Sequence, residues 1–118
     1  MAEKIDEYIL PSIKKVLGIS PDIAAFDTDI TMHINTVLAN LVQMGIGPST
    51  GYAVTSAADK WSDFITYEQP LLLQNVKSYV YIKVRMLFDP PSASSVIDAM
   101  NNQAKEIEYR MYTQVGNY

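Results

Sequence analysis

Apolar side chains recur at intervals of three and four residues through most of this chain, and this spacing restricts the fold to packed helices. The clearest case lies near the C-terminal end, where successive apolar positions are separated by 4, 3, 4, 3 and 4 residues. The members of this seam are Ala93, Ile97, Met100, Ala104, Ile107 and Met111. Such a seam buries one stripe of a long helix against a partner. The sequence therefore predicts an all-α fold, a small helical bundle.

Capping residues and prolines predict where the helices begin and end. Asp27 is expected to cap the first main helix through its carboxylate, and Gly45 suits the position just beyond its end. Pro70 suits the first position of a second helix, whereas Ser95 and Asp98 resemble a capping box for a third. The expected ranges of these three main helices are 27–44, 70–88 and 92–114.

Two smaller elements complete the expected bundle. A short N-terminal helical segment contains Pro11, which either kinks one helix or starts a second one. A long loop over residues 45–69 is rich in Gly and Pro and carries a short helix through Trp61 and Phe64. Within this loop, the segment 52–55 has weak strand character. With 118 residues, the chain is expected to fold as a single helical domain over 1–118.

Composition excludes several classes of function. The chain has no cysteine, which removes disulfides, thiolate metal sites and a cysteine nucleophile. Nine Lys and Arg residues stand against 13 Asp and Glu, a net charge of −4, whereas neutralising nucleic-acid phosphates needs the opposite excess. No apolar run approaches the roughly 20 residues that a membrane span needs, and the N-terminus lacks the apolar core of a signal peptide.

The sequence contains few candidates for catalysis or metal binding. His33 is the single histidine and lies four residues after Asp29, but two ligands do not make a metal site. The segment Gly45-Ile46-Gly47 is not followed by the Lys-Ser/Thr of a phosphate loop. Asp59 and Asp63 have the spacing of a carboxylate pair on a solvated helix face. We expect no catalytic residue, metal or cofactor; an enzyme that brings Asp29, His33 and Asp63 together by folding stays an alternative.

Two features favour protein–protein contacts. The 29 residues from 30 to 58 contain no Lys, Arg, Asp or Glu, and depletion of charge is typical of interface cores. The chain also has eight tyrosines, which can bury a ring while the hydroxyl stays hydrogen-bonded. The candidate residues for a subunit or partner interface are Val42, Ile46, Tyr52, Trp61, Tyr109, Tyr112 and Tyr118.

Several segments of the chain, taken in order, resemble the small head–tail connector (adaptor) proteins of tailed bacteriophages and prophages. The most specific is Phe88-Asp89-Pro90-Pro91 after a helix rich in Tyr, Val and Lys, and one departure is Tyr109, where Trp is expected. The other segments are Asp27-x-Asp29-Ile30-x-x-His33-Ile34-Asn35, Gly45-Ile46-Gly47-Pro48, Trp61-Ser62-Asp63-Phe64, Val76-Lys77-x-Tyr79-Val80-Tyr81-x-Lys83-Val84 and Glu106-Ile107-Glu108-Tyr109-Arg110. The resemblance spans essentially the whole chain.

The resemblance implies a structural protein of the virion neck that has no catalytic residues. Such proteins form an oligomeric ring of about twelve subunits below the portal protein. The ring extends the channel through which DNA passes without sequence-specific binding, and it docks the stopper or a tail-completion protein. Before assembly the protein is expected in the host cytoplasm, and no membrane is involved. The alternative is a small phage-encoded helical module that regulates or binds a host factor.

Overall fold

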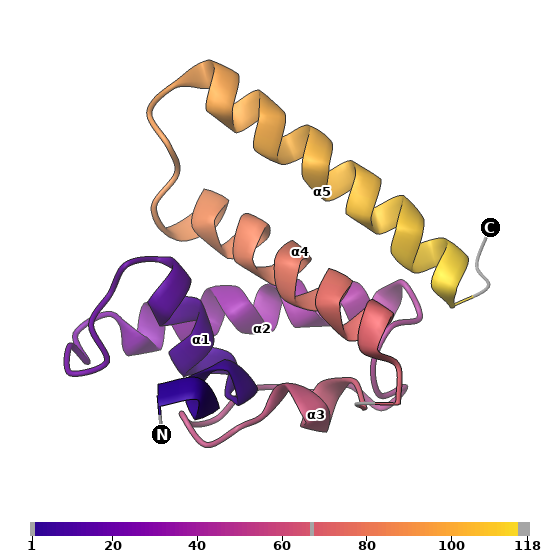
Figure 1. The fold of residues 1–118 in the computed structure, drawn as a ribbon, viewed down its shortest axis with the longest axis horizontal. Coiled ribbons are helices and arrows are strands. Elements are labelled where there is room, and N and C mark those ends of the chain that lie inside the picture. Colours follow the sequence, from indigo (N-terminus) through magenta and orange to yellow (C-terminus); the bar gives the residue numbers. More distant parts are fainter. Residues whose placement is uncertain (1, 67, 116–118) are drawn as a thin grey trace.

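The computed structural model describes residues 2–66 and 68–115, and every regular element within these two ranges is a helix (Figure 1). The elements are a 3-10 helix η1 (Ala2–Glu7) and the α-helices α1 (Ile9–Val16), α2 (Asp27–Gln43), α3 (Trp61–Phe64), α4 (Pro70–Phe88) and α5 (Ser94–Gln114). The all-α prediction is therefore confirmed. The three main helices, the N-terminal helical segment and the short helix in the long loop are all present, and each main helix lies within two residues of its expected bounds.

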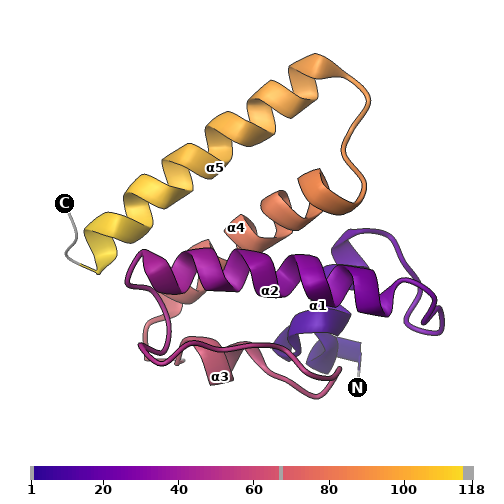
Figure 2. The same ribbon diagram turned by 180° about the vertical axis from the view of Figure 1, so that it is seen from behind.

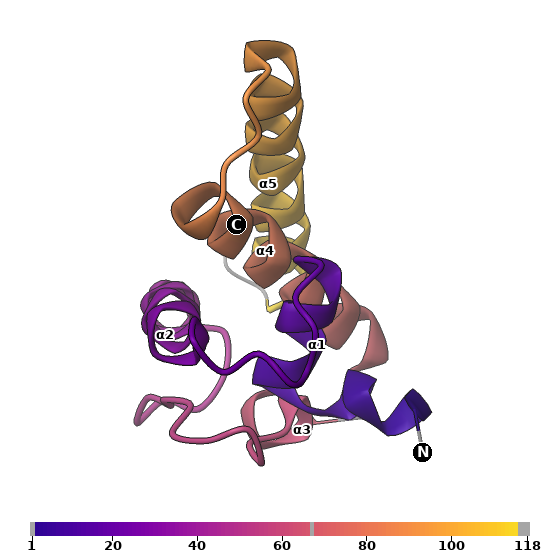
Figure 3. The ribbon, with the colours of Figure 1, turned by 90° about the vertical axis from the view of Figure 1, so that its left-hand side faces the viewer.

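Helix α4 is the centre of the fold. It packs against α2 on one side and against α5 on another, as the side view in Figure 3 shows. Pro70 occupies its first turn, where the missing backbone N–H leaves no helical hydrogen bond unmade. Because partner helices cover it on more than one side, α4 buries a broad set of side chains: Leu72, Leu73, Val76, Tyr79, Val80, Ile82 and Val84.

Helix α1 packs against α2, behind it in the view of Figure 2, and against η1. Pro11 lies in the first turn of α1, so it begins a second helix rather than kinking a continuous one. Ile9 N–H donates to the carbonyl of Asp59 at 3.0 Å, and an isolated β-bridge joins Tyr8 to Lys60. The N-terminal segment is thereby tied to the long loop that carries α3.

Helix α2 ends as the sequence predicts. Gly45 has a φ of +86°, a left-handed conformation that glycine adopts without steric cost. Its N–H donates to the carbonyl of Val42 at 3.0 Å, and the N–H of Ile46 donates to the carbonyl of Leu41 at 2.9 Å. These two bonds make a Schellman motif, which satisfies the last carbonyls of α2 and turns Ile46 back into the core.

The start of α2 differs from the prediction, because Asp27 does not cap it. No side chain caps this end, and Phe26 holds the N-cap position. Asp27 Oδ1 instead lies 2.8 Å from the Nζ of Lys14, whose side chain is 6% exposed. Lys14 Nζ also donates to the carbonyl of Ile23 at 2.6 Å. A buried ammonium group needs an anionic partner. Because the Asp27 carboxylate pairs with Lys14, it does not accept the backbone N–H groups at the start of α2.

Helix α5 also departs from its predicted start. It begins at Ser94 after an extended Ala93, and no side chain caps it. Ser95 and Asp98 therefore lie inside the helix, at its second and fifth residues, and the predicted capping box is wrong. The segment that follows the two prolines stays extended for longer than expected, which delays the helix by two residues.

Only the C-terminal half of the α5 seam is buried. Ala104, Ile107 and Met111 are covered by α4, whereas Ile97 and Met100 are half-buried and Ala93 is exposed. Figure 1 shows the reason: α4 and α5 separate toward the connection at 89–93. The spacing identified the correct face of α5, but not how far its partner helix extends.

The predicted strand character of residues 52–55 is not realised. The segment is irregular, and the side chain of Asn35 on α2 takes the place of a neighbouring strand. The amide of Asn35 donates to the carbonyl of Val54 at 3.1 Å and accepts from the Val54 N–H at 2.7 Å. One side chain therefore satisfies both backbone groups of a buried residue, as a β-ladder would.

Candidate interaction surfaces

The charge-free segment 30–58 has one buried and one exposed side along α2. Its buried side chains are Ile30, Ile34, Val37, Leu38 and Leu41. Its exposed side chains are Met32, Thr36, Ala39, Asn40 and Gln43. The solvent-facing side of α2 beyond residue 29 therefore carries neutral side chains. Val42 lies at the border, half-buried and packed against the core.

The loop that follows α2 is held by one carboxylate. Asp59 accepts a hydrogen bond from the Tyr52 hydroxyl at 2.7 Å and from the backbone N–H groups of Thr55 and Ser56 at 2.8 and 2.9 Å. Burial raises the pKa of Asp59, but these hydrogen bonds to the charged form outweigh it, so the pKa is lowered. Burial and the same carboxylate raise the pKa of Tyr52. The loop is thus fixed in one shape, with the Tyr52 ring half-buried over Phe64 at a centroid distance of 6.1 Å.

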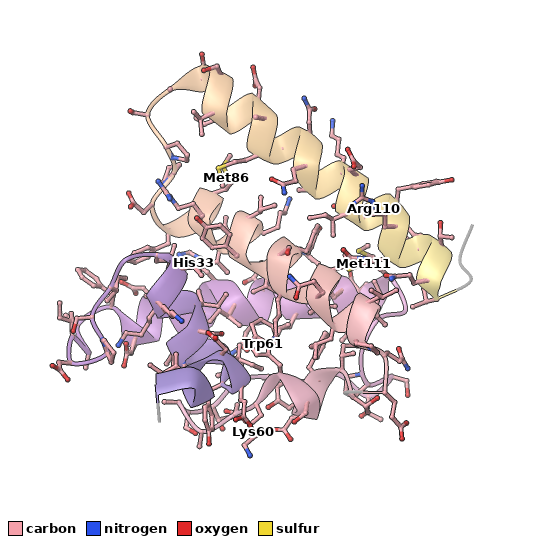
Figure 4. All side chains as sticks on the ribbon, viewed as in Figure 1. His33, Lys60, Trp61, Met86, Arg110 and Met111 are labelled. Atoms are coloured by element: carbon pink, nitrogen blue, oxygen red, sulfur yellow. The ribbon has the colours of Figure 1, made fainter. Side chains whose placement is uncertain are left out.

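Two of the predicted interface residues lie in the core. Ile46 and Trp61 are each 1% exposed. The indole N–H of Trp61 donates to the hydroxyl of Ser12 at 2.9 Å, and Figure 4 shows the side chain within the body of the fold. Lys77 Nζ lies 5.9 Å from the centre of the indole ring. Trp61 therefore joins α3 to α1 and α4 inside one chain.

The tyrosines near the C-terminus differ in exposure. Tyr109 is 70% exposed, and Tyr112 is half-buried. Tyr118 lies outside the described residues. Glu106 and Arg110, four residues apart on α5, form an ion pair, but both side chains are more than half exposed, so the pair adds little stability.

The side chains weighed for catalysis are not brought together as a site. His33 packs against Phe88 at a centroid distance of 6.5 Å, whereas Asp63 accepts the N–H of Lys60 at the start of α3. Asp59 precedes α3 and organises the loop, so Asp59 and Asp63 do not share a helix face as predicted. Within residues 5–66 and 68–115, no group of three or more His, Cys, Asp or Glu side chains is placed to hold a metal ion.

The structure also contains a depression that sequence reasoning missed. Its wall is built from the loop after α2, from α3 and from the ends of α4 and α5, with a volume of about 410 Å³. Its lining includes Gly47, Asp63, Phe64, Leu72 and Val115. Because these residues come from three separate parts of the chain, 45–48, 62–72 and 115, no local sequence signal could have identified them.

None of the described helices is long and apolar enough to cross a membrane. The chain matches the family described as Phage connector protein over residues 9–117. The comparisons found no match among the curated proteins and none among the solved structures. The family match covers nearly the whole chain, including all five α-helices, and it agrees with the motifs that end in Phe88-Asp89-Pro90-Pro91. This chain therefore belongs to the phage connector protein family.

Proposed function

We propose that this connector protein is a non-catalytic adaptor of the phage neck, forming a ring of about twelve subunits below the portal. In this role the chain acts as one helical domain over 1–118, extends the DNA channel and docks the stopper or a tail-completion protein. The observation that carries the proposal is the family match over residues 9–117. Before assembly, the subunit resides in the host cytoplasm.

Charge supports the role of a conduit. The net charge of −4 disfavours tight binding of phosphates, so DNA can pass the ring without being held by it. No sequence-specific contact with DNA is part of the proposal, and neither is a metal or cofactor.

The proposed contact surface combines the neutral side of α2 with the tyrosines. Its members are Val42, Tyr52, Tyr109, Tyr112 and Tyr118, with Ile46 and Trp61 supporting them from the core. Neutral side chains suit a surface that becomes covered, because burying an unpaired charge costs far more than burying an amide or hydroxyl. We assign the loop over residues 45–69 to the docking of the stopper or a tail-completion protein. We assign the tyrosine-bearing C-terminal segment to the contact with the portal.

A pair of charge insertions tests the contact surface. Val42→Lys places an ammonium at the border of the surface, where the long stem can reach water, so the melting temperature should change little. Ile46→Lys buries the same charge in the core and should lower the melting temperature strongly. A third variant, Asn102→Lys, controls for added charge at an exposed position on α5.

The readout is incorporation of each variant into virions that lack the parent protein, measured by mass spectrometry of purified particles. Val42→Lys should be lost from particles, and Asn102→Lys should be retained. Electron microscopy of the neck with an antibody against the chain tests the location itself. Absence of the parent protein from purified virions would contradict the adaptor role and favour the helical regulatory module.

A further inference from the structure

Helix α4 leaves an apolar side chain exposed at each of its ends. Leu71 is 74% exposed and Leu87 is 50% exposed, although both belong to the helix that otherwise forms the centre of the core. A helix of 19 residues places its two ends about 27 Å apart. Figure 1 shows that the two ends of α4 lie at opposite sides of the molecule. The two exposed leucines therefore belong to separate surfaces.

Leu71 borders a recessed surface, which we name the terminal groove. It consists of the depression of about 410 Å³ described above and an adjoining one of about 500 Å³, which share Gln69, Leu72 and Val115. Phe64 and Ile65 contribute apolar surface to it. Among the described residues that line the groove, Asp63 alone carries a charge.

Leu87 belongs to an apolar surface at the other end of α4, which we name the tip patch. Its members are Lys83, Met86, Leu87, Val96, Ile97 and Met100. Val96 is 44% exposed, and the other α5 members are half-buried because α4 and α5 separate here. Met86 lies between the two helices in Figure 4. Lys83 is the charged member of the patch, since the helical spacing places Asp98 on the other side of α5.

We propose that the tip patch of one subunit docks into the terminal groove of the next copy of this chain. The inference rests on the proposed ring and names the surfaces that build it. The patch carries Lys83 and the groove carries Asp63, and each surface exposes apolar side chains beside its charge, with Leu87 and Val96 on the patch and Leu71 at the groove. Two unlike surfaces at opposite ends of one chain make a head-to-tail contact, which closes into a ring or continues as a filament. The neutral side of α2 and residues 49–58 of the loop, which do not line the groove, are then left for the stopper, and the tyrosine-bearing C-terminus is left for the portal.

Each contact of this kind is small, so two isolated subunits should associate only weakly. Closing the ring adds one further contact without a further loss of translational freedom, and a portal template raises the local concentration in the same way. Leu71, Leu87 and Val96 are exposed in the single chain, which allows these three side chains to be changed without disturbing the core.

The absence of cysteine allows the contact to be tested by site-directed crosslinking of the full chain. Leu71→Cys labels the groove, Leu87→Cys labels the tip patch, and Asn102→Cys labels an exposed position of α5 away from both. Pairs of variants are mixed at high protein concentration, treated with a short bismaleimide, and the joined peptides are identified by mass spectrometry. Unchanged melting temperatures verify that each variant is folded.

We expect the mixture of Leu71→Cys and Leu87→Cys to form the mixed dimer about tenfold faster than either variant forms it with Asn102→Cys, because docking raises the effective concentration of the two thiols. A chain that carries both Leu71→Cys and Leu87→Cys should give a ladder of oligomers. Introducing Val96→Asp, at an exposed member of the tip patch, into that chain should remove the ladder.

Two results would overturn the proposal. Crosslinks that join only Leu87→Cys to Leu87→Cys would mean that the tip patches meet each other, and rates equal to the Asn102→Cys control would mean that neither surface binds a second copy. Both results leave the adaptor role untouched, because that role is tested separately by the presence of the parent protein in virion necks.

Discussion

Gly47 offers a sharp test of how the loop after α2 is held. Its φ is +95°, and a Cβ added there would lie 2.5 Å from Cε1 and Cζ of the Phe64 ring. Gly51 has nearly the same backbone, with φ of +92°, but a Cβ there would meet nothing within 4 Å. The two glycines therefore separate the cost of the backbone conformation from the cost of the steric contact.

Gly51→Ala should cost about 1 kcal/mol, since a left-handed alanine is strained by about 1–2 kcal/mol and the stiffer unfolded chain offsets part of this. Gly47→Ala carries the same strain and must also displace the Phe64 ring, which is 4% exposed and cannot move freely. Such overpacking adds about 1–3 kcal/mol. For a chain of this size, 1 kcal/mol shifts the melting temperature by about 4 °C. Thermal unfolding followed by circular dichroism should therefore give a loss for Gly47→Ala at least twice that for Gly51→Ala.

A double-mutant cycle identifies the ring as the cause. Phe64→Leu shortens the side chain, so in its presence Gly47→Ala should cost no more than Gly51→Ala does in the parent. If Gly47→Ala and Gly51→Ala melt at the same temperature, or if Phe64→Leu leaves the cost of Gly47→Ala unchanged, the packing of the loop on Phe64 does not limit stability and this reasoning is refuted.

Three further predictions follow from the packing and the hydrogen bonds. Ile107→Ala should lower the free energy of unfolding by about 2–5 kcal/mol in denaturant titration, because Ile107 is one of the few buried side chains of α5. A denaturation midpoint equal to that of the parent would mean that α5 packs through another face. Lys14→Met should cost about 1–3 kcal/mol because it leaves the carboxylate of Asp27 without its partner, and Asp27→Asn in the same chain should recover part of this loss, whereas additive costs would contradict the pairing. Burial, and after it the 2.6 Å hydrogen bond to Glu108, raise the pKa of Tyr79 above its value of about 10 in the unfolded chain. Above a pH of about 10 the unfolded chain therefore loses the Tyr79 proton while the folded chain keeps it, so the free energy of unfolding should fall as the pH rises. Tyr79→Phe should make that fall less steep in unfolding measured as a function of pH.

The helices could be predicted because each is encoded locally. The stripe of α4 and the Schellman glycine at Gly45 act within one or two turns, and the structure follows both. The prediction that Asp27 caps α2 was wrong because Asp27 pairs with Lys14, which lies 13 positions earlier in the chain, beyond the reach of a local signal. The α5 seam was predicted too long because periodicity identifies a face and not the reach of the partner helix.

The candidate surfaces were harder to predict because burial depends on the tertiary fold. Ile46 and Tyr52 belong to the same charge-free segment, yet one lies in the core and the other holds the loop through Asp59. The terminal groove needs Gly47, Asp63 and Val115 to meet from separate parts of the chain. Sequence reasoning could therefore point to the segment but not to its exposed members.

The charge-free segment gains a physical explanation once its two sides are separated. Its buried side, centred on Ile34 and Leu38, needs apolar residues in any helical bundle. Its exposed side, with Thr36, Asn40 and Gln43, could carry charges without loss of stability, so the core does not explain their absence. A surface that is hydrated in the free subunit and covered in an assembly is better served by neutral polar groups, because their desolvation costs less than that of unpaired ions. Folding therefore does not explain the lack of charge on the outer side of α2, and the proposed contact surface rests on this feature of the chain.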